Sequence, residues 1–111
     1  MNRLFNIRTI KTKEFTVTVD AVEDVCPDLS WDETGEVVGK INDGTYWLFC
    51  ARARCEHAHL GILAEDYLGN CVYKDAADFV KDGYFRDMVK SVCVEARKAV
   101  NAMTIPTMRQ V

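Results

Sequence analysis

Alternation of apolar and polar residues predicts two β-strands and a hairpin. From Phe15 to Val19, aromatic and β-branched residues alternate with threonine, which favours a strand with one buried face. The stretch from Thr45 to Cys55 also alternates, and residues 60–64 follow as its partner strand after a turn. We expect the sheet built on this hairpin to be the surface on which the other elements pack.

The residues of the hairpin also predict which of its faces are covered and how the chain continues after it. Trp47 and Phe49 put large side chains at the start of the first strand, which predicts a central strand covered on both sides. Arg52 and Arg54 share one face, so we expect that face to be solvated at the far end. Residues 65–70 are predicted to form a bend, because Gly69-Asn70 tolerates positive φ, and residues 71–73 a short third strand.

Helical spacing predicts one long helix near the C-terminus, from Tyr84 to about Met103. Apolar residues recur there every three or four positions, which marks one buried stripe, and a helix of this length spans about 30 Å. The stripe consists of Phe85, Met88, Val89, Val92, Cys93, Ala96, Val100 and Met103. Pro106 is expected to end the helix, which leaves residues 104–111 as a flexible tail.

Two shorter helices are predicted upstream. Residues 20–29 are expected to form a loop, after which Ser30 and Glu33 have the spacing of a capping box for a helix over residues 31–41. Asp32, Glu33 and Glu36 would then lie in the first two turns, where the helix dipole favours acids. Asp75 is expected to cap a second short helix, Ala76 to Lys81, that ends at Asp82-Gly83.

These elements define an α+β fold, in which a long C-terminal helix packs on an antiparallel sheet of three to four strands. At 111 residues the chain has the size of one domain, and about half of its residues are apolar, enough for a single core. We assign residues 14–103 to this domain and residues 1–13 to a basic arm or edge strand.

Charge is strongly segregated along the chain, although the net charge is only −3. Residues 1–13 carry four bases and no acid, whereas residues 14–36 carry eight acids and no base. Such a run is either a solvated loop and helix start or a surface that attracts a basic partner. For the second reading the partner-binding candidates are Asp20, Glu23, Asp24, Asp28, Asp32, Glu33 and Glu36.

The five cysteines show no CxxC spacing, and we expect them to be reduced, with Cys50 and Cys93 in the core. Cys55, His57 and His59 alternate, so their side chains would share a strand face and could bind zinc. A turn within this stretch would break the alternation. We therefore favour solvated turn histidines and predict no metal and no cofactor.

The sequence gives little support for a membrane protein, a secreted protein, an enzyme or a nucleic-acid-binding protein. No apolar run approaches the ~20 residues of a membrane span, and the N-terminus lacks the apolar stretch of a signal peptide, so we expect a cytoplasmic protein. No nucleophile with an adjacent base and no phosphate-binding loop is present, which argues against an enzyme. The acidic run argues against direct binding of nucleic acid.

The stretch Leu63 to Tyr73, which contains D-Y-L-G-x-C-x-Y, precedes G-Y-x-x-D-M-V at Gly83 to Val89. With Asp32 to Glu36, this resembles a group of small uncharacterised proteins of phages and mobile elements, over roughly residues 30–98. The resemblance implies a phage accessory protein, and many such proteins inhibit host defences, anti-CRISPR proteins among them. We therefore expect an inhibitor that binds a host complex through its acidic surface. The alternative is a homo-oligomeric accessory protein, a homodimer for example, that uses an edge strand or the Trp47 and Phe49 face.

Overall fold

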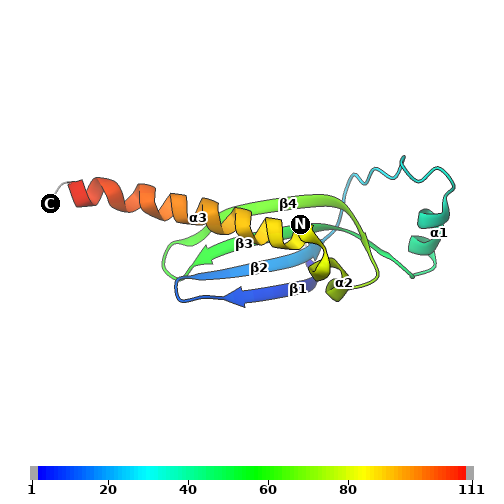
Figure 1. The fold of residues 1–111 in the computed structure, drawn as a ribbon, viewed down its shortest axis with the longest axis horizontal. Coiled ribbons are helices and arrows are strands. Elements are labelled where there is room, and N and C mark those ends of the chain that lie inside the picture. Colours follow the sequence, from blue (N-terminus) through cyan, green and yellow to red (C-terminus); the bar gives the residue numbers. More distant parts are fainter. Residues whose placement is uncertain (1–2, 110–111) are drawn as a thin grey trace.

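The chain folds into one antiparallel sheet with a long helix along one of its faces (Figure 1). The computed structural model describes residues 3–109, with side chains for residues 3–103. Its elements are β1 (Arg3–Lys11), β2 (Phe15–Val22), α1 (Glu36–Asn42), β3 (Trp47–His57), β4 (Gly61–Tyr73), α2 (Ala76–Lys81) and α3 (Gly83–Arg109). The four strands follow one another in the order β1-β2-β3-β4, each antiparallel to its neighbour. This arrangement confirms the predicted α+β fold.

The core lies between α3 and one face of β2 and β3. Alternate residues of both strands are buried on that face, and the small side chains of Ala51 and Ala53 leave room for α3. From α3, Phe85, Met88 and Val92 pack against them, as the helical stripe predicts. The expected long helix therefore covers the sheet because its apolar stripe matches the buried face.

An aromatic cluster closes the core at the end of the sheet near α2. Phe79 of α2 is fully buried, and its ring centroid lies 5.0 Å from Tyr73, 5.8 Å from Phe49 and 6.1 Å from Phe85. Asp75 caps α2, as predicted, by accepting a hydrogen bond from the backbone N–H of Asp78 at 2.8 Å. The two helices α2 and α3 are thereby held against the sheet.

The strands differ from the predicted ones in two places. β4 is unbroken from Gly61 to Tyr73, so the bend predicted at residues 65–70 is wrong. Phe49 pairs with Cys71 and Ala51 pairs with Leu68, which leaves Gly69 and Asn70 together opposite one residue of β3. The Gly69-Asn70 signal therefore encodes a β-bulge inside a strand, with Asn70 at φ 56°.

β2 is longer than predicted, and two side chains of β3 differ from their predicted exposure. β1 is the edge strand that was one of two predictions for residues 1–13, and β2 extends to Val22, three residues into the predicted loop. Trp47 is 51% exposed, so β3 is not covered on both sides at its start. Arg52, expected in solvent, is buried.

The helices differ at their ends. α1 begins only at Glu36, after Gly35 at φ 74°, so the capping box predicted from Ser30 and Glu33 is wrong. α3 runs through Pro106 to Arg109, past the predicted end near Met103, although proline disfavours a helix interior. Residues 104–109 of the predicted tail are thus helical in backbone, and residues 110–111 lie outside the described part.

Candidate acidic interface

The chain between β2 and β3 forms a lobe that projects from one end of the sheet (Figure 1). We call residues 23–46 the acidic lobe. It carries six of the seven carboxylates predicted to bind a partner, together with Asp43, and Lys40 is its one basic residue. None of the residues of α1, which lies within the lobe, is buried. The lobe is therefore built almost entirely of solvent-accessible residues.

The β-bulge of β4 anchors the start of the lobe to the sheet. The backbone N–H of Asn70 donates to Asp24 Oδ2 at 2.7 Å, and the N–H of Asp28 donates to Asn70 Oδ1 at 2.8 Å. Asn70 makes both bonds from the bulge, where its φ is 56°. Asn70 is a positioning residue that sequence reasoning missed, although the Gly69-Asn70 pair was a usable signal.

Several carboxylates of the lobe accept hydrogen bonds from its own backbone. Asp28 accepts from the N–H of Ser30 at 3.0 Å, and Asp32 Oδ2 accepts from the N–H of Val38 at 2.9 Å, inside the first turn of α1. The hydrogen bonds from Ser30 hold the pKa of Asp28 below its ordinary value. These acids shape the lobe, and the lowered pKa of Asp28 favours its charged form.

Three glutamates of the lobe are exposed: Glu23, Glu33 and Glu36. Glu36 forms an ion pair with Lys40 at 3.6 Å, which is a typical i,i+4 pair on a helix. Glu23 and Glu33 take part in none of the side-chain hydrogen bonds or ion pairs found within the described part of the chain. Their carboxylates are the ones most available to another molecule.

Exposed apolar side chains lie among these acids. Val25 is 73% exposed, Trp31 is 55% exposed and Val38 is 36% exposed. Tryptophan is enriched at the centres of protein interfaces, where it supplies much of the binding energy. The lobe therefore combines negative charge with an exposed aromatic side chain, as protein-binding surfaces do.

Asp20 does not belong to this surface. It lies in β2, is 4% exposed, and accepts hydrogen bonds from Asn6 Nδ2 at 2.9 Å and Arg52 Nη2 at 3.4 Å. Arg3 lies 3.8 Å away as a second cation. The prediction that Asp20 faces a partner is corrected, because the strand continues past it and pairing with Arg52 buries the carboxylate.

The alternating cysteine and histidines do not converge on a metal. Cys55 is fully buried beneath α3, and burial together with the neighbouring Cys93 raises its pKa to about 11. His57 packs against Phe15, and its Nδ1 accepts the backbone N–H of His59 at 3.1 Å. Among residues 3–103, no three metal-ligating side chains form a group.

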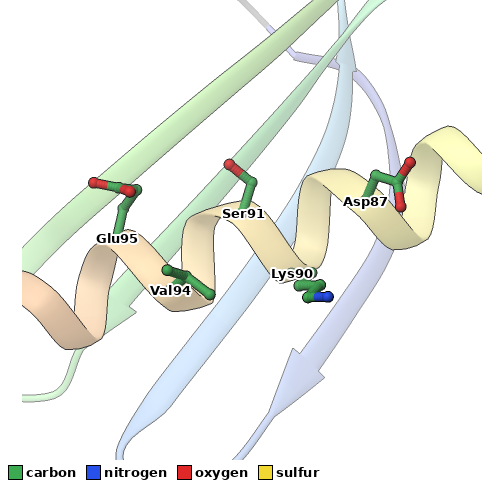
Figure 2. A pocket seen from close by; sticks show the side chains of 5 residues that line it. All are labelled: Asp87, Lys90, Ser91, Val94 and Glu95. Carbon is green, nitrogen blue, oxygen red and sulfur yellow. The ribbon is translucent and has the colours of Figure 1, made fainter.

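A shallow pocket of about 300 Å³ lies on α3. Figure 2 shows its five lining side chains, all on α3 with the strands behind the helix: Asp87, Lys90, Ser91, Val94 and Glu95. One lysine between two acids is typical of a solvated helix face.

Comparison of the chain with protein-family models, with characterised proteins and with solved structures gives no match. The likeness to small phage proteins therefore stays a prediction. Within the described residues, no helix is both long and apolar enough to cross a membrane.

Proposed function

We propose that this protein is a phage-encoded inhibitor, of the anti-CRISPR kind, that binds a host defence or nucleic-acid-handling complex through its acidic lobe. The observation that carries the proposal is the lobe itself: a projecting segment with six of the predicted carboxylates, one base and an exposed tryptophan. Proteins that handle nucleic acids have basic grooves, and negative charge on a rigid support competes for such grooves. The inhibitor would act in the host cytoplasm, without a cofactor, catalysis or direct contact to nucleic acid.

The anchoring of the lobe supports recognition rather than passive solvation. A loop that is only solvated needs no bonds to the sheet, whereas this one is tied to Asn70 through both Asp24 and Asp28. Pre-ordered binding segments lose less conformational entropy when they bind. The start of the lobe, held at Asp24 and Asp28, is therefore suited to a surface with matching positions of basic groups.

Binding to purified CRISPR effector complexes at rising salt concentration tests the proposal. We expect an affinity that falls with salt and that drops about tenfold in the triple variant Glu23→Gln/Glu33→Gln/Glu36→Gln. The matched control is Asp87→Asn/Glu95→Gln, which removes exposed acids from α3. If the triple variant and the control inhibit a sensitive complex equally well, the electrostatic mechanism is wrong.

A homo-oligomeric accessory protein without inhibitory activity is the second candidate. β1 and β4 are the outer strands of the sheet, and outer strands present backbone groups that a second copy can pair with. Sedimentation equilibrium tests this candidate, because a homo-oligomer has a mass that is a multiple of the mass of one chain or that rises toward such a multiple with concentration. A monomer at all concentrations removes this alternative.

A further inference from the structure

An aromatic pocket opens at the end of the sheet from which the acidic lobe projects. It measures about 160 Å³ and is lined by Phe5 of β1, Trp47 of β3, and Asp75 and Ala76 at the start of α2. The ring centroids of Phe5 and Trp47 lie 5.1 Å apart with their planes at 83°, so the rings form a corner. Trp47 is 51% exposed, so solvent reaches the part of its side chain that lines the pocket.

The chemistry of the walls favours a cation. Aromatic faces carry partial negative charge and attract ammonium and guanidinium groups. Asp75 adds a full negative charge at the rim, and the hydrogen bond from Asp78 N–H to its Oδ1 holds the carboxylate in place. Proteins bind alkylated ammonium groups against aromatic faces of this kind.

The size and polarity of the pocket narrow the class of cation. Ligand pockets for whole small molecules measure about 300–1,000 Å³, so this one accommodates only a head group. A primary ammonium brings three N–H donors and is strongly hydrated, and Asp75 is the one lining residue whose side chain can accept a hydrogen bond, so some of those donors would lose water without gaining a partner. We infer that the pocket binds a methylated ammonium head group, whose methyl groups contact the rings while Asp75 balances the charge.

Two sources supply this chemistry: a free quaternary ammonium compound and a methylated lysine of a partner protein. Trp47 directly follows the acidic lobe in the chain, so the pocket lies beside the end of the lobe and a protein seated there would be near it. The inference does not depend on the proposed function, because it rests on Phe5, Trp47 and Asp75 rather than on the glutamates of the lobe.

Fluorescence titration of the full chain tests the site. The chain has two tryptophans, so Trp31→Phe leaves Trp47 as the single reporter, placed in the wall of the pocket. We expect a saturable change with tetramethylammonium and with a peptide that contains trimethyllysine. The same peptide with a carbon in place of the charged nitrogen should bind about fivefold more weakly, because it keeps the shape and loses the cation–π attraction.

Two variants and one control complete the test. Asp75→Asn keeps a good helix cap and removes the charge, so binding should weaken about fivefold while the melting temperature stays the same. Binding to Trp47→Ala, followed by calorimetry, should be lost, whereas Tyr84→Ala removes an exposed ring elsewhere and should bind normally.

Binding of the peptide without binding of tetramethylammonium assigns the site to a protein partner, and the reverse assigns it to a free cation.

The inference is overturned by any of three results. These are no saturable response to either cation, equal affinity for the neutral peptide, or full binding by Trp47→Ala with native circular dichroism. None of them bears on the glutamate variants of the lobe, so failure of this site and failure of the proposed function are separate observations.

Discussion

Removing the carboxylate of Asp20 should destabilise the protein and leave partner binding intact. The side chains of Asp20 and Arg52 are only 6% and 8% exposed, so Asp20→Ala leaves a buried guanidinium without this carboxylate. Breaking a buried pair in this way costs about 3–5 kcal/mol. We expect a cost of about 3 kcal/mol, near the lower limit, because the Arg52 contact is long at 3.4 Å.

The assay is thermal and urea unfolding at neutral pH, followed by circular dichroism. For a domain of this size, 3 kcal/mol lowers the melting temperature by about 12 °C. The double variant Asp20→Ala/Arg52→Met should recover part of the loss, because it removes the buried cation as well. Glu23→Ala, which removes an exposed acid just beyond the same strand, should change the stability by less than about 0.5 kcal/mol.

A cost below about 1 kcal/mol for Asp20→Ala, or a double variant less stable than Asp20→Ala alone, would contradict the role of Asp20 as the partner of a buried cation. The same variant separates protein stability from binding at the proposed interface. At temperatures well below unfolding, Asp20→Ala should still bind the target, whereas the triple glutamate variant should be stable and bind weakly.

Three further outcomes follow from the packing and the pKa shifts. Phe79→Ala should cost about 3–5 kcal/mol in urea unfolding, because it empties the centre of the aromatic cluster; a loss below about 1 kcal/mol contradicts the packing. The pKa of Glu65 is lowered, first by its hydrogen bond from Arg54, so its contribution is present above the unfolded pKa and is lost as pH falls through the folded one. Glu65→Gln should thus cost less than about 1 kcal/mol at pH 7, and the difference should begin to shrink as pH falls below the unfolded pKa of about 4.3 and vanish only below the lowered folded pKa. In thiol titration at pH 8 the exposed Cys26 should react at once, whereas Cys55 and Cys71, whose pKa burial raises to about 11, should react only on unfolding.

Elements with a strong local period were predictable from the sequence. The threonine alternation placed β2, the helical stripe placed the buried face of α3, and Asp75 marked the start of α2. In each case the residues that form the element are neighbours along the chain, so their spacing records which side is buried. The acidic character of residues 23–36 was predictable for a similar reason, because those acids follow one another along the chain with no base between them.

Pairing between distant residues was not predictable. Asp20 looks like the other acids of its segment, and only the register that sets it opposite Arg52 buries it. Asn70 looks like a bend residue, and only the uninterrupted ladder with β3 makes it a bulge that anchors Asp24. Burial of a charge depends on its cross-strand partner, which is far away in the sequence.

The sequence by itself determined the fold class, the long amphipathic helix and the separation of basic and acidic segments. The tertiary structure decided which of the acids remain available and where the lobe is attached. It also brought Phe5, Trp47 and Asp75 together, three residues from β1, β3 and the start of α2 that share no sequence motif. The physical reason is that local spacing records the period of a helix or strand, whereas a site is made by contacts between elements that only the packed sheet brings together.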